Sequence, residues 1–405
     1  MSHPAAPSAT VRLGDRTKKI GSGITPLGGH SSYTRSGIPL IRSQNVHMNR
    51  FEPDGLAFIS ADQDAEMAAT RVQTGDVLIN ITGASIGRVC VVPAELCPAN
   101  VNQHVCIIRS DGTLDPDFLA FYFASPSFQK LVLDSQAGAT RQALTKALIE
   151  DLEIPLFPLP QQRRIATSLR EQLAQVEKAR ASLTSQIEGV YALVPAILRE
   201  VLASGETKGW PRRKLSEVCD IQLGKMLSPK SKTGVRSISY LRNANVQWGR
   251  FDLRDMAEMD FSEAEESKFI LVPGDLLVCE GGEPGRAAVW QGEISRCCYQ
   301  KALHRLRPRN QAVSAHFVFF RLWHGSFQNE FTDSHSKTTI AHLPAIRLAE
   351  LPIHTPTIEV QNKITQKLNA QLEAQRAVET RLTERLREID SLPGRLLCQA
   401  FSGNI

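Results

Sequence analysis

The sequence lacks the features of a membrane protein or a secreted protein. Its longest apolar runs, such as Phe118 to Ala124, are far too short to cross a bilayer, and the polar segment Met1 to Thr10 contains no apolar signal core. The eight cysteines include no CxxC pair, so the sequence predicts neither a disulfide framework nor a zinc or other metal site. We therefore expect a folded protein of the cytoplasm with no membrane contact.

The sequence also lacks the motifs of several enzyme classes. It contains no HExxH motif and no phosphate loop of the form GxxxxGK[ST], since the glycine-rich stretch Gly281 to Arg286 has no lysine at the required place. It has no Asn/Asp-Pro-Pro-aromatic tetrad, with which amino-methyltransferases grip a flipped base. We interpret His104 and His304, beside or within predicted strands, as structural or DNA-facing residues in preference to catalytic bases. The sequence therefore predicts no catalytic residue.

Two long apolar repeats, Leu159 to Leu202 and Ile358 to Ala400, organise the chain. In each, apolar residues recur in alternating steps of three and four, which is the heptad pattern of a coiled-coil helix. Their flanking sequences also match, so we favour two equivalent packed helices over two unrelated amphipathic ones. The predicted seam consists of Leu173, Val176, Arg180, Leu183, Ile187, Leu372, Glu379, Leu382 and Leu386.

Two seam positions are charged. Arg180 and Glu379 are equivalent, because they are separated by 199 residues, the offset found elsewhere in these helices. Charges at a seam are costly unless they are paired. If the helices pack antiparallel about a pseudo-twofold axis near these residues, the two side chains face each other. We therefore expect an Arg180–Glu379 ion pair that fixes the register of the helices.

The segments before the two helices repeat as well. Ile41 to Val46 is echoed by Leu241 to Val246, and the turn Gly75-Asp76 by Gly274-Asp275, in the same order and at similar spacing. This pattern predicts a tandem duplication. Short alternating runs after the Gly-Asp turns predict strands, and Asp115 followed by proline predicts a capped helix, so we expect an α+β fold.

Polar, carboxylate-poor loops recur in both halves and suit DNA. Arg and Lys pair with guanine edges, Asn and Gln with adenine, and Ser, Thr or loop amides with phosphates, while the alternative for each residue is a solvated loop surface. The candidates in the first half are Ser22, Thr25, Arg42, Gln44, Asn45, Thr82, Ser85, Arg88, Gln103, His104, Arg141, Gln142 and Lys146. Those in the second half are Lys225, Arg242, Asn243, Asn245, Arg286, Gln300, Lys301, Lys337, Thr338 and His342.

The loop Gly83 to Arg88 is the strongest single candidate. Its glycines lie beside a basic residue, and glycine lets backbone amides approach an anion closely. We therefore expect this loop to bind phosphate. The net charge of +5 and the pI near 8.8 permit such a role without demanding it, because many enzymes are equally basic.

Two polar domains alternating with two heptad helices resemble the specificity subunit of type I restriction-modification systems. The resemblance rests on the Leu152 to Ile165 entry into the first helix, the two Gly-Asp turns and the Ser-Gly endings of the helices, and it covers nearly the whole chain. One departure is that the Glu-Gln usual before the helix appears as Gln161-Gln162 in the first half and is split as Glu359-Val360-Gln361 in the second.

The resemblance implies a fold and a set of partners. Target recognition domains would span residues 1–157 and 206–356, and long helices over 158–205 and 357–405 would separate them as an antiparallel, pseudo-twofold coiled coil. Each domain would recognise half of a split site in double-stranded DNA, while the helices carry two modification subunits. S-adenosylmethionine would bind to the modification subunits. ATP and Mg would bind to restriction subunits that are separate from them. This chain would therefore hold no cofactor and catalyse no reaction.

Two other functions remain open. A stand-alone DNA methyltransferase or nuclease is disfavoured by the missing motifs. A coiled-coil scaffold that binds only protein is the third possibility.

Overall fold

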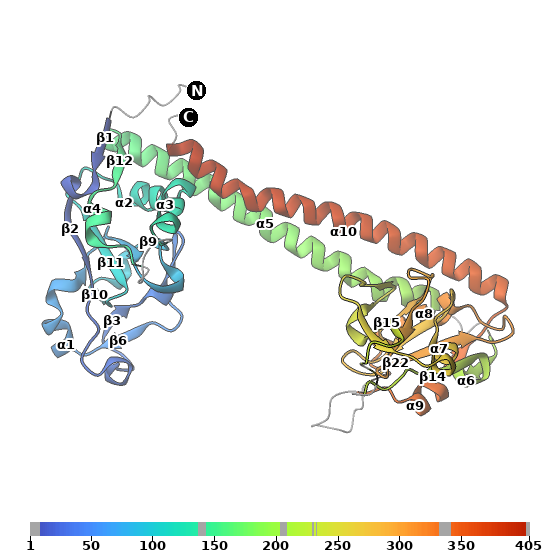
Figure 1. The fold of residues 1–405 in the computed structure, drawn as a ribbon. Coiled ribbons are helices and arrows are strands. Elements are labelled where there is room, and N and C mark those ends of the chain that lie inside the picture. The colour runs from blue at the N-terminus through green and yellow to red at the C-terminus, as the bar shows by residue number, and fades with distance from the viewer. Residues whose placement is uncertain are drawn as a thin grey trace. The chain divides into compact units, whose positions relative to one another are not determined.

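The computed structural model describes residues 9–136, 143–202, 209–228, 231, 233–331 and 342–401. The chain forms two compact units, Met1–Thr184 with Glu384–Ile405, and Ser185–Thr383. Each unit contains a β-rich domain and parts of two long helices, α5 (Leu159–Leu202) and α10 (Ile358–Phe401), as Figure 1 shows. The two extended helices predicted from the heptads are thus confirmed.

The first unit is built on an antiparallel sheet that is buried on both faces. Its strands, in spatial order, are β2 (Thr17–Ser22), β11 (Val105–Ser110), β8 (Val77–Asn80) and β9 (Val89–Val91). Val77 and Ile79 face one apolar core, and Leu78 between them faces another, because successive side chains of a strand point to opposite faces. Burial on both faces explains why β8 is continuously apolar.

Helices cover one face of this sheet and a second sheet covers the other. α2 (Pro116–Ala124) and α3 (Pro126–Gln136) share a core with the start of α5 and the end of α10. The second sheet has the order β6 (Ala57–Ile59), β3 (Ile38–Ile41), β10 (Ala99–Val101) and β7 (Arg71–Val72). The Asp115 carboxylate accepts hydrogen bonds from the N–H groups of Asp117 and Phe118, which confirms the predicted cap of α2.

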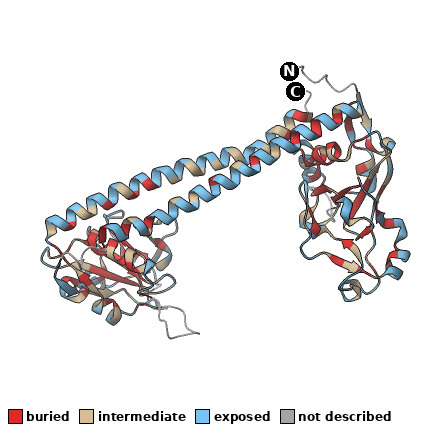
Figure 2. Ribbon diagram, turned by 180° about the vertical axis from the view of Figure 1, so that it is seen from behind, coloured by how far each residue is buried: buried red, intermediate tan, exposed pale blue. Residues whose placement is uncertain are grey.

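The second unit repeats this plan. Its main sheet has the order β14 (Cys219–Leu223), β22 (Leu303–Pro308), β19 (Leu276–Cys279) and β20 (Ala287–Val289). Its second sheet has the order β18 (Ala257–Asp260), β15 (Ser237–Leu241) and β21 (Cys298–Tyr299), and α8 (Ala315–Phe327) covers the other face. Leu276 and Val278 face the core that contains α8, whereas Leu277 faces the second sheet. Figure 2 shows the buried strands of each unit in red.

The remaining elements are short. In the first unit they include β1 (Ala9–Arg12), β4 (Val46–His47), β5 (Arg50–Phe51), α1 (Ala61–Glu66), α4 (Lys146–Glu150) and β12 (Glu153–Leu156). In the second they include β13 (Arg212–Lys214), α6 (Leu215–Val218), β16 (Val246–Gln247), β17 (Arg250–Phe251), α7 (Glu263–Phe269), α9 (Ala345–Glu350) and β23 (Pro352–His354). β1 pairs with β12, and β13 with β23, so the first strand of each domain lies beside its last.

A buried glutamine joins the first domain to its long helix. Gln162, in the first turns of α5, is fully buried, and its Oε1 accepts a hydrogen bond from the Asp115 N–H at 2.8 Å. Its Nε2 donates to the carbonyls of Thr113 at 2.9 Å and Phe157 at 2.8 Å. One amide thereby ties the entry to α2 to the entry to α5.

Gln361 repeats this arrangement in the second unit. It is also fully buried, and its Oε1 accepts from the Ser314 N–H at 2.8 Å. Its Nε2 donates to the carbonyls of Ala312 at 3.2 Å and Pro356 at 2.8 Å. The departure from the Glu-Gln pattern in the second half therefore leaves the bonded glutamine in place.

The long helices pack against each other in opposite chain directions. In the first unit, Arg180 Nε donates to Asp390 Oδ1 at 2.9 Å, and in the second unit Tyr191 Oη donates to Glu379 Oε1 at 2.5 Å. The residue numbers of both pairs sum to 570, as an antiparallel register requires. The predicted Arg180–Glu379 ion pair is wrong, because each side chain has another partner. The heptad pattern shows which residues form the seam. It does not fix the register, because one helix can slide along the other by a whole heptad and still present the same apolar positions.

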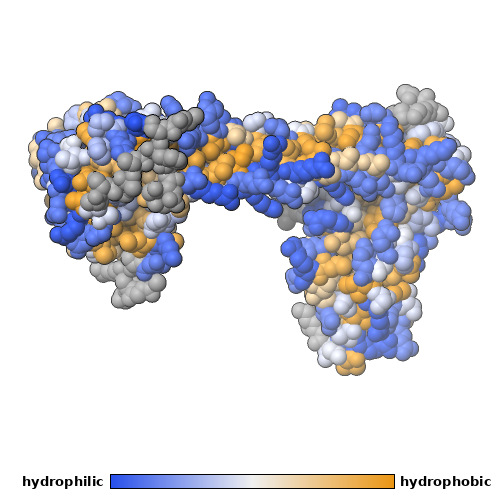
Figure 3. All heavy atoms as spheres, turned by 90° about the horizontal axis from the view of Figure 1, so that it is seen from above, coloured by the Kyte–Doolittle hydropathy of each residue, from blue (hydrophilic) through white to orange (hydrophobic). Residues whose placement is uncertain are grey.

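The seam is only partly buried. Val176, Leu183 and Leu372 are buried, whereas Arg180 is exposed. The half-buried seam residues are Leu173, Ile187, Glu379, Leu382 and Leu386. Figure 3 shows apolar residues along the helix pair with hydrophilic residues beside them. The helices are therefore held by a narrow apolar stripe.

Within the described residues, α5 is the one helix long and apolar enough to cross a membrane, with a window of mean hydropathy 1.2. A search for uninterrupted apolar runs misses it because polar residues interrupt the window. This is weak evidence for a membrane span, since packed helices pass the same test. Val194, Leu198 and Leu202 of α5 belong to the core of the second unit.

Replacing Gln162 by alanine should destabilise the first unit by about 3 kcal/mol, because the change leaves an N–H and two carbonyls without buried partners. The matched control is Gln172→Ala, since Gln172 lies on the same helix, is exposed and bonds only to Ser168. That change should cost less than about 0.5 kcal/mol. Hydrogen exchange of peptides from α2 measures both, and equal protection in the two variants would contradict the role of Gln162.

Candidate nucleic-acid interface

In the first unit, predicted site residues come together at one end of the main sheet. The Gly23 N–H donates to the Val105 carbonyl at 3.2 Å, and the Ile81 N–H to the His104 carbonyl at 3.0 Å. Thr82 Oγ1 lies 2.7 Å from His104 Nδ1. These bonds gather the loops that follow β2 and β8 and the turn that precedes β11. We call this loop-bearing end of the sheet the edge. The predicted residues at this edge are Ser22, Thr25, Thr82, Gln103 and His104.

Asn80, the last residue of β8, connects two further segments to this edge. Its buried Nδ2 donates to the Ser43 carbonyl at 2.9 Å and to Ser85 Oγ at 3.1 Å. Thr82 also forms an isolated bridge with Ala143, immediately before α4 and Lys146. Five segments far apart in the sequence are therefore neighbours.

Asn45 builds the turn that presents its neighbours. It is buried, its Oδ1 accepts from the Arg42 N–H at 3.0 Å, and its Nδ2 donates to the Glu52 carbonyl at 2.9 Å. Arg42 is half-buried, and its Nη2 donates to the Gly55 carbonyl at 2.6 Å. Gln44 is exposed. The asparagine amide is thus occupied and buried within the turn, whereas the Gln44 amide is exposed, although its Nε2 donates to the Gly55 carbonyl at 3.1 Å.

The loop Gly83–Arg88 spells GxSxG but lacks the geometry of a hydrolase nucleophile. It forms a 3-10 turn between two strands, whereas a nucleophilic serine of this motif sits between a strand and a helix. The N–H groups of Gly87 and Arg88 donate to the carbonyls of Asn80 and Ser85. The half-buried Arg88 side chain makes no hydrogen bond or ion pair with the described part of the chain. Its guanidinium is therefore the free group of this loop.

The second unit brings equivalent loops to the same end of its sheet. The Lys225 N–H donates to the Tyr299 carbonyl at 3.1 Å, and Asn243 Nδ2 donates to the Gly281 carbonyl at 2.7 Å. Arg286 Nη2 donates to the Asn243 carbonyl at 3.0 Å. The predicted residues gathered there are Lys225, Arg242, Asn243, Arg286, Gln300, Lys301 and His342.

Two polar residues of the second unit are buried and bond to its own backbone. Asn245 is buried and accepts from the Arg242 N–H at 2.8 Å, as Asn45 does in the first unit. His304 is fully buried within β22, with Nε2 2.9 Å from the Leu343 carbonyl oxygen. Burial lowers the pKa of His304, which keeps the ring neutral. Of the two roles expected for His304, structural or DNA-facing, its burial fits the structural one.

The basic side chains at the two edges differ in their partners. In the second unit, carboxylates pair with the predicted cations in Lys225–Glu265 at 2.7 Å, Arg242–Asp255 at 2.7 Å and Arg286–Glu283 at 3.0 Å. The ion pair and hydrogen bond with Lys225 lower the pKa of Glu265. In the described first unit, Arg42 and Arg88 have no carboxylate partner. Lys146, also in the first unit, pairs with Glu150 at 3.4 Å, so Arg42 and Arg88 are the two predicted cations there without a carboxylate among the described residues.

The Gly-Asp turns lie at the opposite end of each sheet, and their buried carboxylates form ion pairs with partly exposed arginines. Asp76 is fully buried and bonds to Arg109 Nε and Nη2 at 2.7 and 2.8 Å. Asp275 bonds to Arg307 in the same way, at 2.7 Å to both nitrogens. These arginines were not predicted, although their equivalent positions in the two repeats are a usable signal.

Four predicted residues, Arg141, Gln142, Lys337 and Thr338, lie outside the described residues. Across the described ranges, no group of three or more His, Cys, Asp or Glu residues could hold a metal ion. Burial raises the pKa of the thiols of Cys90 and Cys106 to about 12, so neither is a reactive thiolate at neutral pH.

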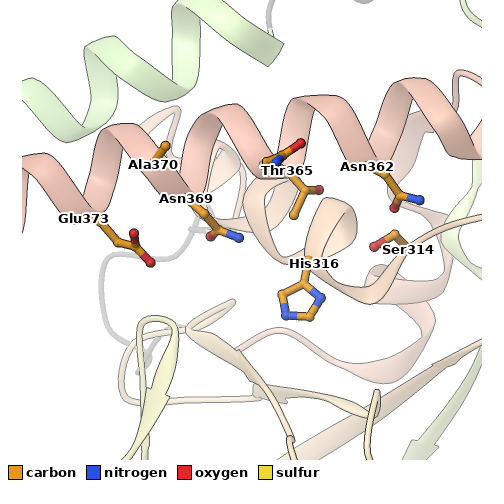
Figure 4. Close-up of a pocket in the computed structure, with 8 residues that line it drawn as sticks. Ser314, His316, Asn362, Thr365, Asn369, Ala370 and Glu373 are labelled. Carbon is orange, nitrogen blue, oxygen red and sulfur yellow. The ribbon is translucent and has the colours of Figure 1, made fainter.

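A polar cavity of about 450 Å³ lies beside α10 at the start of α8 (Figure 4). His316 Nε2 lies 3.2 Å from Gln291 Nε2, and burial lowers the pKa of His316. None of the predicted site residues lines this cavity. Its lining residues are Ser314, His316, Asn362, Thr365, Gln366, Asn369, Ala370 and Glu373.

Comparison with known families places these two edges in context. A model described as "Type I restriction modification DNA specificity domain" matches the chain twice, over residues 32–188 and 207–388. The chain belongs to the DNA specificity subunits of type I restriction-modification systems. The two matches confirm the duplication, and the family match confirms the resemblance seen in the sequence.

Similar specificity subunits include two from enterobacteria. The chain is 21% identical to the EcoKI specificity subunit of Escherichia coli K12, over 91% of this chain and 82% of that one. It is 20% identical to the StySPI specificity subunit of Salmonella potsdam, with the same shares covered.

Two solved structures share the fold of this specificity subunit. The HsdS subunit from Thermoanaerobacter tengcongensis is 20% identical, with a TM-score of 0.64 over 98% of this chain and 97% of that one. A chain described under "Structural basis underlying complex assembly and conformational transition of the type I R-M system" is also 20% identical, with a TM-score of 0.78 over 99% and 100%.

Replacing Asp76 by alanine should destabilise the first unit by about 3 kcal/mol, because it strands the Arg109 guanidinium beside a buried site. Asp151→Ala in the same unit is the control, since Asp151 and its partner Arg12 are both more than half exposed. It should cost less than about 1 kcal/mol. Urea unfolding followed by circular dichroism tests both, and similar costs would show that burial does not strengthen the Asp76 pair.

Proposed function

We propose that this specificity subunit recognises a bipartite site in double-stranded DNA, one half through each β-rich domain, and catalyses no reaction itself. The observation that carries the proposal is the repeated edge, where equivalent polar loops meet at the same end of both sheets. The recognition domains would span residues 1–157 and 206–356. The two domains share one fold but differ in the sequences of these loops. The two half-sites that they recognise would therefore differ.

The loops supply both base-reading and phosphate-holding groups. Arg88 has no partner within the described chain, so it suits a phosphate oxygen. Asn45 and Asn245 would act indirectly, by shaping the turns that present Arg42 and Arg242. The exposed amides of Gln44 and Gln103 suit base edges, and the half-buried Gln300 is a further candidate. Thr82 Oγ1 bonds to His104, so it would act by positioning that ring.

The long helices would be the spacer and the docking platform. We assign residues 158–205 and 357–405 to this role, with two modification subunits that bind S-adenosylmethionine and separate restriction subunits that use ATP and Mg. The support is that the similar chains are named as specificity subunits of type I restriction enzymes. DNA methylation by the chain alone would instead favour the methyltransferase alternative.

Arg88→Ala should weaken DNA binding by the assembled complex at low salt and reduce the slope of log affinity against log salt by about 0.9, the loss of one phosphate contact. Arg286→Ala should change the slope far less, because Glu283 already neutralises Arg286. Fluorescence anisotropy with site-bearing and scrambled duplexes measures both. The control is Arg12→Ala. Arg12 is an exposed arginine at the end of strand β1, and it already pairs with Asp151, so its removal should leave the slope unchanged.

Three outcomes would count against these assignments. An altered base preference with an unchanged slope would contradict a phosphate role for Arg88. Equal binding to both duplexes by the wild-type complex would contradict site recognition. Absence of any DNA binding would favour the protein scaffold.

Lengthening both long helices by three heptads, after Ser185 in α5 and after Glu384 in α10, should widen the gap between the half-sites by about nine base pairs. The added residues extend each helix by about 31 Å, at about 1.5 Å per residue, while DNA rises about 3.4 Å per pair. Nine pairs turn the duplex by roughly 310 to 320°, so the second half-site would lie about 40 to 50° from its original face, a rotation that the helix pair must accommodate. Whole heptads preserve the seam.

Mapping of methylated adenines in DNA modified by the variant complex measures the new gap. A variant of native length, with the exposed residues of one heptad shuffled, should keep the original gap. The same half-sites at the original gap in the lengthened variant would show that the helices do not set the spacing.

A further inference from the structure

Leu27 stands almost fully exposed at the tip of a tight turn in the first unit. Its exposed fraction is 91%. The Gly29 N–H donates to the Pro26 carbonyl at 3.0 Å, and Gly28 has φ 88° and ψ −4°, which are the features of a type II turn with Leu27 at its second position. Glycine suits the positive φ of that turn. The backbone geometry therefore holds the leucine away from its own domain.

The turn belongs to the loop that leaves β2 at the candidate interface. At the start of this loop, Gly23 approaches the neighbouring strand so closely that a Cβ would lie 1.7 Å from the Val101 carbonyl oxygen. Ile24, the next residue, is 51% exposed. The loop is thus seated beside the turn that carries Gln103 and His104.

The second unit exposes apolar side chains at the equivalent place. A Cβ on Gly224 would lie 2.4 Å from the Gln300 carbonyl oxygen, so this glycine seats its loop as Gly23 does. Met226 and Leu227 follow it, with exposed fractions of 61% and 41%. Single exposed apolar residues are common, but two repeats with different loop sequences place them at the same edge.

The charge around both loops suits a polyanion. Between Thr17 and Arg50 the sequence contains five lysines and arginines and no carboxylate. Between Ile221 and Arg250 it contains six and no carboxylate, although Lys225, Arg236 and Arg242 pair with carboxylates of other segments, so the charge is stronger evidence for the first unit than for the second. Proteins that bend DNA insert leucine, isoleucine or methionine between base pairs, so these side chains and this charge fit the same partner.

We propose that Leu27 in the first unit, and Met226 with Leu227 in the second, are wedges that enter a base step of each half-site and unstack it. This inference rests on the proposed DNA-binding function. Such a wedge reads sequence through deformability, because flexible pyrimidine–purine steps cost less to unstack than stiff ones. Leu27 would thus help to determine specificity without any hydrogen bond to a base.

The test uses the complete complex with modification subunits and duplexes that carry 2-aminopurine at one purine at a time. In the wild type, fluorescence should rise at a step in the half-site bound by the first unit, because the base there is unstacked. Leu27→Ala should abolish this rise and weaken binding about tenfold. A mismatch at that step should restore most of the lost affinity, since it removes the cost of unstacking.

The control variant is Val272→Ala. Val272 is 40% exposed and lies in the turn before β19, at the opposite end of the strand from the candidate interface. It should bind and unstack DNA as the wild type does. Base flipping by the modification subunits should raise fluorescence at the methylated adenine with all variants, which shows that each variant is folded and assembled.

Wild-type affinity and an unchanged fluorescence rise in Leu27→Ala would overturn the wedge and leave DNA recognition intact. A tenfold loss that the mismatch does not restore would also overturn it, because the leucine would then contribute a simple contact. Absence of site-specific binding by the wild type would instead remove the proposed function on which the wedge depends.

Discussion

The placement of each domain on its long helix depends on one buried side chain. The segments that lead into two helices meet at Gln162 and again at Gln361, and their buried N–H and carbonyl groups need hydrogen-bond partners. A glutamine amide offers one acceptor and two donors, which match the single N–H and two carbonyls at each junction. Glutamate would supply no donor, and a leucine of similar size would leave all three groups unpaired. The loops at the candidate interface are built on a frame that this amide secures.

The periodic parts of the molecule were predictable from the sequence. Heptads indicated α5 and α10, and the repeated Gly-Asp turns indicated equivalent strands, because both patterns reflect burial with a fixed period. The register between the helices was not predictable. A seam is the same after a slide of one heptad, so the true Arg180–Asp390 pair needed three-dimensional information.

The candidate interface was predictable only in outline. The sequence indicated which loops are polar, but not whether a polar side chain is occupied by its own backbone. Asn45 and His304 satisfy backbone groups inside the fold, whereas Arg88 does not. Leu27 was missed because a search for polar residues ignores an apolar side chain whose exposure depends on a turn. The buried polar residues and the exposed leucine were both mispredicted because the accessibility of a side chain is a property of the folded chain.

The pairing of β1 with β12 has an evolutionary consequence. Thr10 lies opposite Pro155, so the chain enters and leaves the first domain at one place, and β13 with β23 does the same for the second. A domain whose ends are adjacent can be exchanged as a cassette by recombination at two short junctions. The incoming cassette must supply a backbone that accepts the glutamine amide and apolar side chains that pack against α5 and α10. The joined ends therefore allow a whole domain to be exchanged without redesign of the long helices.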